Sequence, residues 1–531
     1  MFTERCCSVH CLICPLPSAI QKKLKNFLAR ALRRALVLCS GAVAVAGCDT
    51  VTSSSASYIQ FEPEVAELTI GDTLWVQARV HDARGRVTRA SGIVWRPVLG
   101  AVIDRRPDDS DGWARLLARW PGTHQVVVEW GGHVDSMQVT VHGHPNLRLT
   151  TIDVGTFACG IADGGGTYCW GSGQYVGPTP NLPDGAHMPA FGAPRRVRGD
   201  VALQSVVVAA QTACGLAADG QAYCWGNAQS GSLGQPGLHS AAEPLPVAGG
   251  SRYALIAGGG HHVCGLTDSG DAYCWGSDRY GQLGIPEDAG NCSMVSPCSD
   301  VPAHVAADVS FASLHAGGFH TCGLTAHGAA YCWGLDNHHQ LGTTLEPDHC
   351  DDMFGLYHCS RTPVPVEGAP PFVQLALGLH HSCGLTVAGR AYCWGRNDMG
   401  QLGTGVPGDA TPTPQPVDTP VLFTSLWSGT GTTCGIAADG AAYCWGESGL
   451  GQAGSEPLMR CPSNNQGCTP RPEAVVGNLR FSRIAIRAAS ACGLAEDGVY
   501  CWGSIWGMAR DDGEPWPVTD RATPYRVYGT R

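Results

Sequence analysis

Apolar and polar residues alternate with a period of two along much of the chain, a pattern that predicts β-strands. Before the first repeat it marks four segments, separated by glycine-rich turns such as DARG (Asp82–Gly85). The segments are TLWVQARVH (Thr73–His81), GIVWRPV (Gly92–Val98), HQVVVEW (His124–Trp130) and SMQVTVH (Ser136–His142). Short alternating strands joined by such turns predict a β-sandwich over residues 58–143.

From Leu147 onward one pattern of cysteine, glycine and aromatic residues occurs seven times. The copies are CGIADGGGTYCWG (Cys159–Gly171), CGLAADGQAYCWG (Cys214–Gly226), CGLTDSGDAYCWG (Cys264–Gly276), CGLTAHGAAYCWG (Cys322–Gly334), CGLTVAGRAYCWG (Cys383–Gly395), CGIAADGAAYCWG (Cys434–Gly446) and CGLAEDGVYCWG (Cys492–Gly503). Their tryptophans lie 50 to 61 residues apart. A period of this length with several strands per unit predicts a β-propeller, so we expect an all-β, seven-bladed β-propeller over residues 147–531, preceded by the β-sandwich.

Each copy is expected to be a β-hairpin. If Cys214 lies opposite Cys224, the residues left for the loop are Ala218–Gly220, a three-residue turn that ends in glycine. The opposed cysteines are then close enough for a disulfide. Tyr223 and Trp225 share one face of the hairpin, where we expect both rings to pack against the neighbouring blade.

Two details of the hairpin follow from the same register. Gly215 lies opposite Tyr223 and is expected to leave room for its ring. The seventh copy is one residue shorter, which leaves a two-residue loop at Glu496–Asp497.

Twenty of the 26 cysteines follow Cys48, and they fall into ten short-range pairs. An even, paired set in an exported chain predicts disulfides, whereas zinc knuckles and redox sites use C-x2-C spacings. Seven pairs belong to the hairpins: Cys159 with Cys169, Cys214 with Cys224, Cys264 with Cys274, Cys322 with Cys332, Cys383 with Cys393, Cys434 with Cys444, and Cys492 with Cys501.

Three more pairs follow their tryptophans at nearly one offset. They are Cys292 with Cys298, Cys350 with Cys359, and Cys461 with Cys468. An equal place in the repeat means an equal place on the propeller, so we expect three disulfide-clipped loops on one face. Insertions that were merely stabilised by a disulfide are the alternative.

A second element follows the tryptophans and carries a family resemblance. It reads YGQLG at Tyr280–Gly284, HQLG at His339–Gly342 and MGQLG at Met399–Gly403, with weaker forms GSLG and GQAG in two other units. Together with the hairpins it resembles the regulator of chromosome condensation repeat family over Leu147–Arg531. Residues 58–143 resemble the bacterial immunoglobulin-like group 2 family, whose domains usually serve as spacers or adhesive stalks.

Closure of the propeller is expected from the C-terminal segment. TPYRVYG (Thr523–Gly529) resembles PTPQPV (Pro412–Val417) and TPVPV (Thr362–Val366), and no such segment precedes the first hairpin. We therefore expect the C-terminal strand to complete blade one.

Residues 1–47 have the features of a signal peptide. Basic residues end at Arg34, and the apolar run from Ala35 to Gly47 is too short to span a bilayer. Val45–Cys48 resembles the bacterial lipobox, which implies cleavage before Cys48 and a lipid on that cysteine. An ordinary cleavage site with an incidental cysteine is the alternative. Residues 48–57, with SSSAS, fit a flexible tether.

Charge excludes some functions. After residue 47 the chain holds 27 basic against 44 acidic residues, a formal charge of about −17, and no lysine. This balance argues against nucleic-acid binding, and it excludes P-loop and Schiff-base lysines.

For two further groups of residues, metal binding is an interpretation to weigh against a structural one. His262, His320 and His381 recur two residues before the hairpin cysteine, where hydrogen bonding is the interpretation that we prefer to a metal ring. A cluster of acidic residues and histidines lacks the spacing of a known Ca²⁺ loop and fits a solvated charged segment better. Its members are Glu346, Asp348, His349, Asp351, Asp352 and His358.

These observations predict an envelope-anchored binding module, exported to the periplasm or cell surface of a bacterium and held to the membrane by its lipid alone. Its partner would be an extracytoplasmic protein or glycan, without a cofactor, a metal or a catalytic residue. The alternatives are a polysaccharide-active or other enzyme with a site in the central channel, and a secreted enzyme inhibitor. Export argues against nucleotide exchange on a GTPase.

Overall fold

The computed structural model describes residues 58–69, 73–88, 93–97, 101–105, 112–118, 122–142, 147–171, 191–199, 201–228, 230–286, 297–345, 348–352, 355–504, 522–527 and 530. These residues form 39 strands and no helix. In this part of the chain no helix is long and apolar enough to cross a membrane.

Residues 58–142 form two sheets that share one core. The first contains β1 (Tyr58–Glu62), β3 (Thr73–His81), β7 (Trp113–Ala118) and β6 (Ala101–Arg105), with β4 (Val87–Thr88) beside β3. The second contains β2 (Val65–Thr69), β9 (His133–His142), β8 (Gly122–Trp130) and β5 (Val94–Pro97). Buried residues of both sheets, among them Val76, Val80, Val126 and Val139, form one hydrophobic cluster. The four strands predicted here are present, and β3 has the predicted bounds.

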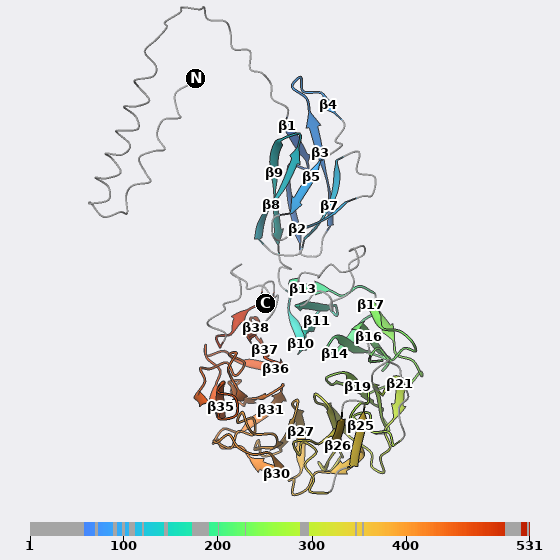
Figure 1. The fold of residues 1–531 in the computed structure, drawn as a ribbon, viewed down its shortest axis with the longest axis vertical. Coiled ribbons are helices and arrows are strands. Elements are labelled where there is room, and N and C mark those ends of the chain that lie inside the picture. The colour runs from blue at the N-terminus through green and yellow to red at the C-terminus, as the bar shows by residue number, and fades with distance from the viewer. Residues whose placement is uncertain are drawn as a thin grey trace, which may run out of the picture. The chain divides into compact units, whose positions relative to one another are not determined.

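The described residues between 147 and 530 form seven antiparallel sheets arranged in a ring (Figure 1). The first strand of each sheet lies toward the centre and the fourth lies at the rim (Figure 1). The first strands are β10 (Leu149–Val154), β14 (Leu203–Ala209), β18 (Leu255–Gly258), β22 (Ser313–Ala316), β27 (Phe372–Leu377), β31 (Phe423–Ser428) and β36 (Phe481–Arg487). The second strands are β11 (Phe157–Ala162), β15 (Thr212–Ala217), β19 (His262–Leu266), β23 (His320–Leu324), β28 (His381–Thr386), β32 (Thr432–Ala437) and β37 (Ser490–Ala495).

The third and fourth strands form the outer half of each sheet. The third strands are β12 (Thr167–Gly171), β16 (Ala222–Asn227), β20 (Ala272–Ser277), β24 (Ala330–Leu335), β29 (Ala391–Gly395), β33 (Ala442–Glu447) and β38 (Gly498–Gly503). The fourth strands are β13 (Phe191–Arg196), β17 (Ser240–Pro246), β21 (Cys298–His304), β26 (Gly355–Pro365), β30 (Thr411–Pro416), β35 (Gly467–Ala474) and β39 (Tyr525–Arg526). Two sheets have a fifth strand, β25 (Asp348–Asp352) on β26 and β34 (Met459–Arg460) on β35.

The second and third strands of every sheet form the predicted hairpin. Cys214 lies opposite Cys224, and the turn closes through the hydrogen bond from Gly220 N–H to the Ala217 carbonyl oxygen (3.0 Å). The seventh hairpin has the two-residue loop Glu496–Asp497, as the register predicts.

All seven hairpins carry a disulfide between directly opposed cysteines, whose Cα atoms are 4.0–4.1 Å apart. The bonds join Cys159 with Cys169, Cys214 with Cys224, Cys264 with Cys274, Cys322 with Cys332, Cys383 with Cys393, Cys434 with Cys444, and Cys492 with Cys501. These are the seven pairs that the hairpin register predicts, and each bond stays within its own sheet.

The glycine of the hairpin makes room for a different side chain from the one predicted. A Cβ atom at Gly215 would overlap the Leu203 side chain at 2.6 Å, and one at Gly265 would overlap the Tyr253 ring at 2.5 Å. Leu203 and Tyr253 come from the first-strand side of their own sheets, not from the hairpin. The expectation that the ring of Tyr223 occupies this space is therefore wrong, because the second strand also has the first strand on its other side.

Each tryptophan packs against the preceding sheet, as predicted. Trp394 lies in one cluster with Cys322, Leu341 and Val366 of the fourth sheet. Its indole N–H donates to the Gln340 carbonyl oxygen (3.0 Å), which belongs to the HQLG element of that sheet. Four more tryptophans repeat this bond to the preceding sheet, at 3.1 Å: Trp275 to Ser232, Trp333 to Gln282, Trp445 to Gln401 and Trp502 to Gln452.

The prediction about closure is wrong. β39 pairs with β38 and so completes the last sheet, while the first sheet obtains its fourth strand from β13. The P-x-P-V-like segment follows its own hairpin in every sheet, and the first sheet already has one at Ala193–Val197. The ring closes instead through side chains, because Trp170 packs with Val527 and the Cys492 and Cys501 hairpin. A single bridge between Leu147 and Thr530 accompanies this contact.

We expect Trp394→Phe to lower the free energy of unfolding by about 1 kcal/mol more than Trp225→Phe does. Both changes shrink a buried ring, but only the Trp394 N–H loses an acceptor, since that of Trp225 has none within the described residues. Urea titration of the full chain with its disulfides intact measures the difference. Equal losses for the two variants would show that the indole hydrogen bond does not hold neighbouring sheets together.

Candidate functional site

The turns and loops that differ most between the repeats lie at one end of the ring. In each sheet the turn between the first and second strands lies at the same end as the connection between the third and fourth, because the strands are antiparallel neighbours. We call this end the turn face. All three predicted clipped loops belong to third-to-fourth connections, so those of their residues that the structure describes lie on it.

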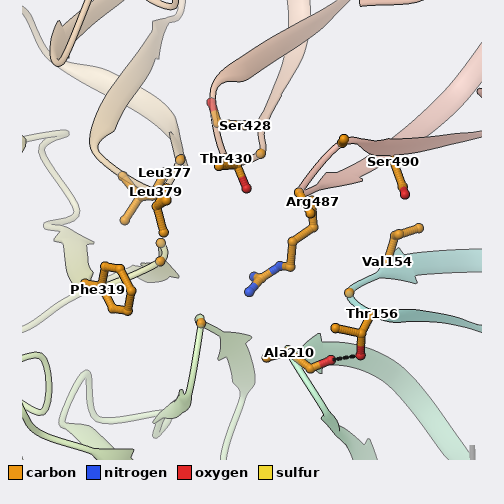
Figure 2. A pocket seen from close by; sticks show the side chains of 18 of the residues that line it. Val154, Thr156, Ala210, Phe319, Leu377, Leu379, Ser428, Thr430, Arg487 and Ser490 are labelled. Atoms are coloured by element: carbon orange, nitrogen blue, oxygen red, sulfur yellow. Dashed lines mark hydrogen bonds between the residues drawn. The ribbon is translucent and has the colours of Figure 1, made fainter. Parts of the chain in front are cut away.

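The axial cavity opens among the turns of this face (Figure 2). Its volume is about 570 Å³, and all seven sheets contribute to its wall. Most of the lining is glycine, alanine and aliphatic, including Val154, Leu377 and Leu379, and Arg487 extends into the middle of the space (Figure 2). The site is thus an apolar chamber with one guanidinium.

Backbone hydrogen bonds join successive turns around this chamber. Gly260 N–H donates to the Gly317 carbonyl oxygen (2.9 Å), Gly318 N–H to that of Gly378 (2.9 Å), and Leu379 N–H to that of Gly429 (3.2 Å). Glycine is required where turns approach so closely, since a Cβ atom at Gly260 would overlap the Gly318 carbonyl. These bonds already use several of the amides that line the chamber.

Arg487 crosses the channel to a sheet that is not its neighbour. Its two terminal nitrogens donate to the carbonyl oxygens of Gly259 (2.6 Å) and Gly258 (2.8 Å), which belong to the third sheet. Burial lowers the pKa of Arg487, but a guanidinium stays protonated at physiological pH. The side chain therefore braces the ring across its centre with a positive charge.

Aromatic and charged side chains form an arc on the turn face between the third and fifth sheets. Tyr280 makes edge contacts with Phe319 (ring centroids 5.1 Å apart) and Tyr357 (5.0 Å). Arg279 donates to the Tyr357 hydroxyl (3.2 Å) and lies over its ring. His380 continues the row, with its ring centroid 6.0 Å from that of Phe319 and 4.9 Å from that of His338. We call these six residues the aromatic arc.

The clipped loops pack back onto the preceding sheet. Tyr357, between β25 and the Cys359 end of its loop, reaches Arg279 and Tyr280 of the third sheet. In the sixth sheet the Ser463 hydroxyl donates to the Asp398 carbonyl oxygen (3.2 Å). The disulfides therefore hold loops that cover the junctions between sheets.

The recurrent histidines have a structural role. Nε2 of His262 lies 2.8 Å from the Thr321 hydroxyl, which itself donates to the Gln282 carbonyl oxygen (2.9 Å). The histidine must then be the donor, which leaves its buried Nδ1 without a proton. His320 and His381 make the same bond, also at 2.8 Å, to Ser382 and Thr433 of the following sheet.

Several predicted site residues lie outside the described residues. These include Cys48, Cys292 and Glu346, and the side chains of Asp348, His349, Asp351 and Asp352. Of the three predicted loop pairs, Cys350 with Cys359 and Cys461 with Cys468 are disulfides, and Cys298 is disulfide-bonded. Among the described side chains no group of three potential ligands is placed to hold a metal ion.

Sequence reasoning missed Arg487 as a channel residue. Three residues before the start of each second strand, the other six sheets have Val154, Ala209, Gly259, Gly317, Gly378 and Gly429. An arginine among small and aliphatic residues at one repeat position was the available signal.

Comparison with protein families identifies the repeat. Residues 219–266, 269–324, 327–385 and 388–435 match the regulator of chromosome condensation (RCC1) repeat, and residues 254–282, 311–340 and 372–401 match a second form of it. Residues 219–435 are therefore similar to RCC1 repeats.

Known proteins with RCC1 repeats resemble part of this chain. The Xenopus laevis regulator of chromosome condensation is 26% identical over 153 residues, which are 29% of this chain and 34% of that protein. The probable E3 ubiquitin-protein ligase HERC4 of Rattus norvegicus is 29% identical over 173 residues, 30% of this chain and 14% of that protein. The chain thus spans about a third or less of the length of either relative.

Solved structures show the same fold. Yeast RCC1 (Prp20), crystallised with Kap60, superposes with a TM-score of 0.55 at 19% identity, covering 72% of this chain and 85% of that one. Human WBSCR16 gives a TM-score of 0.53 at 18% identity, covering 68% and 94%. The ring is therefore an RCC1-like propeller.

The buried histidines make stability depend on pH. Burial lowers the pKa of His262, His320 and His381 to about 3, whereas the unfolded chain takes up protons near pH 6.5. Their contribution to stability is complete above pH 6.5 and is lost as the pH falls from there toward 3.

We expect His381→Thr to reduce the loss of unfolding free energy between pH 7 and pH 4 by up to about 3 kcal/mol. Threonine occupies the same position in the sixth sheet, at Thr432. Denaturant titrations at the two pH values measure the change, with the exposed His239→Thr as control. An unchanged acid dependence would mean that His381 is protonated in the folded protein.

Proposed function

We propose that the ring is a seven-bladed propeller that binds a partner protein through the turn face, with the aromatic arc at the centre of the contact. The residues that all repeats share are used inside the ring: the cystines fix the hairpins, and the tryptophans and glycines fit one sheet to the next. The turns and loops differ more from sheet to sheet, although glycine is needed where two turns approach closely. Function is expected where a repeat departs from its pattern.

The observation that carries this proposal is the asymmetry of the turn face. At the residue just before the second strand, the third to fifth sheets have His261, Phe319 and His380, whereas the sixth and seventh have Gly431 and Ala489. Half-buried tyrosine, phenylalanine and arginine side chains are those that contribute most to protein interfaces. The clipped loops support them on a preordered backbone, which lowers the entropic cost of binding.

Binding, rather than catalysis, suits the chemistry at the axis. The described wall of the cavity has one guanidinium, His261, a few hydroxyls and mostly apolar or glycine residues, and it lacks the carboxylate pair of a glycosidase. The hydroxyls of Thr156, Ser428 and Ser490 bond to groups other than His261, so they do not form a nucleophile with its base. Protein binding is known for proteins of similar fold: yeast Prp20p has binding properties toward Gsp1p and histones, and Kap60 binds yeast RCC1. Inhibition of a secreted enzyme is one form that such binding could take here.

We propose export and membrane anchoring for the same chain. The apolar run that ends at Gly47 and the sequence Val45–Cys48 support a lipoprotein signal, with lipid on Cys48 and a tether to residue 57. An immunoglobulin-like sandwich over residues 58–143 would then hold the propeller away from the membrane. The two sheets with one shared core support this assignment.

Cys48→Ser should release the protein from the membrane fraction and abolish its lipid labelling in a bacterial host. The physical reason is that no other described segment offers an apolar helix to anchor the chain. Fractionation and metabolic labelling with a fatty acid measure this. A membrane-bound Cys48→Ser protein, or a mature N-terminus other than Cys48, would contradict the proposed anchor.

The partner should be captured from envelope extract by the chain that lacks residues 1–57, and Phe319→Ala with Tyr357→Ala should reduce its capture at least tenfold. A matched double variant at the opposite end of the sheets, Val387→Ala with Leu422→Ala, should capture as wild type does; both side chains are exposed. Mass spectrometry of the bound proteins measures the ratio. Loss of capture in the control alone would place the binding surface on the other face.

A further inference from the structure

The channel of the propeller holds an excess of positive charge. In the seven first strands, the ionisable side chains other than histidine are Asp153, Arg483 and Arg487. Burial raises the pKa of the Asp153 carboxyl, and the guanidinium of Arg487 opposes this rise. The histidine among these strands, His315, is neutral because burial lowers its pKa to about 4. One carboxylate thus faces two guanidinium groups in the described channel, although the protein as a whole is acidic.

The carboxylate of Asp153 is already engaged. Its Oδ2 accepts from Val208 N–H (2.7 Å) and its Oδ1 from Val154 N–H (3.0 Å), so it fastens the first sheet to the second. Arg483 in turn donates through Nε to the Ile152 carbonyl oxygen (3.0 Å). Neither side chain lines the cavity, so the charge that the cavity presents is that of Arg487.

Arg487 has donors left for a ligand. A guanidinium carries five N–H groups, and two of them reach Gly258 and Gly259. The two carbonyls also fix the plane of the group, so an anion meets a donor that is already oriented. A half-buried cation gains more from an anionic partner than an exposed one does, because water screens it less.

The size and the wall of the cavity indicate what else the ligand contains. A volume of about 570 Å³ lies within the range of roughly 300–1,000 Å³ that is usual for small-molecule sites. Val154, Leu377 and Leu379 offer apolar surface. Several backbone N–H groups of the neighbouring turns already donate to the carbonyl oxygens of the next turn.

The wall also has hydroxyls, but those of Thr156 and Ser490 donate to carbonyl oxygens and that of Ser428 bonds to Thr433. A phosphate or a sugar would therefore find one guanidinium, His261 and few hydroxyls without a partner among the described residues, whereas a carboxylate on an apolar body matches both the guanidinium and the aliphatic wall.

We propose that the axial cavity binds a small organic carboxylate, with the carboxylate on the guanidinium of Arg487 and its apolar body against the aliphatic wall. Phe319 of the aromatic arc also lines this cavity, but the guanidinium and the aliphatic wall that would hold the ligand are not part of the arc, so the site goes beyond the proposed protein binding. A ligand held here would lie beneath any protein that docks on the turn face.

Isothermal titration of the full chain with octanoate tests the proposal, with 1-octanol as the probe of equal length that lacks the charge. We expect saturable binding of octanoate with one site per chain, and an affinity for 1-octanol at least tenfold weaker. Equal affinities for the two probes, or no saturable octanoate binding, would overturn the proposal.

Three variants locate the site. Thr430→Trp should abolish octanoate binding by filling the cavity, and the described Thr430 side chain makes no hydrogen bond that would be lost. Val387→Trp, at a side chain that is 89% exposed in a hairpin turn on the opposite end of the ring, is the matched control and should bind as wild type does. Arg487→Gln should weaken octanoate binding at least tenfold while leaving that of 1-octanol unchanged.

Folding of each variant is checked by its thermal midpoint, because Arg487 also braces the ring. If Arg487→Gln does not fold, Thr430→Trp and the comparison of the two probes still decide the result. Undiminished octanoate binding by folded Thr430→Trp would place the ligand elsewhere. Tyr357 does not line the cavity, so capture of the partner protein by Tyr357→Ala alone is a separate readout, and the two proposals fail independently.

Discussion

The arrangement of the sheets around the axis depends on tryptophan side chains, each of which belongs to one sheet and packs in the core of the preceding sheet. A four-stranded sheet alone cannot bury both of its faces, so each sheet needs a neighbour to cover it. The indole of Trp394 lies in the core of the fourth sheet, and its N–H bonds the Gln340 carbonyl there, although its backbone belongs to the fifth. The cystine behind each tryptophan, such as Cys383 with Cys393 here, fixes the hairpin that carries it. The disulfide thereby fixes the position and the orientation of the indole without any contact from the neighbouring sheet.

The sequence alone was sufficient to predict a feature of the fold wherever the contacts that determine this feature join residues close together in the chain. The register of Cys214 with Cys224 follows from ten residues of chain, and the packing of Trp225 on a neighbour follows from which face it shares. The role of Gly215 was predicted wrongly because a hairpin considered alone has only one partner strand, and the sheet supplies another. Arg487 was missed because its acceptors at Gly258 and Gly259 lie 229 and 228 residues away, and no periodicity reports such a contact.

Repetition also explains why the candidate sites lie where they do. A residue in a hairpin is constrained on both sides, by the cystine and by the next sheet's tryptophan, so the seven copies stay alike. A residue in a turn of the same sheet contacts mainly the next turn and the axis. The residue just before the second strand can be Gly431 in one sheet and Phe319 in another. Arginine is possible at position 487 because the seventh sheet has Ser490 where others have a histidine, whereas a Cβ atom at Gly378 would overlap the His381 ring. The aromatic arc and Arg487 both occupy positions of this kind.

Closure of the ring between its last and first sheets also places Arg487 in the axial cavity. The four strands of the first sheet come from one continuous stretch, residues 149–196, so each sheet can form without the distant end of the chain. The last junction is made by side chains, with Trp170 on the seventh sheet and Arg483 on the Ile152 carbonyl oxygen. Arg487 leaves the same last sheet and reaches the third, a contact that exists only once the ring is closed. The charge at the axis is therefore held by the complete ring: a comparison of the repeats reveals the unusual arginine, but not its acceptors in the third sheet.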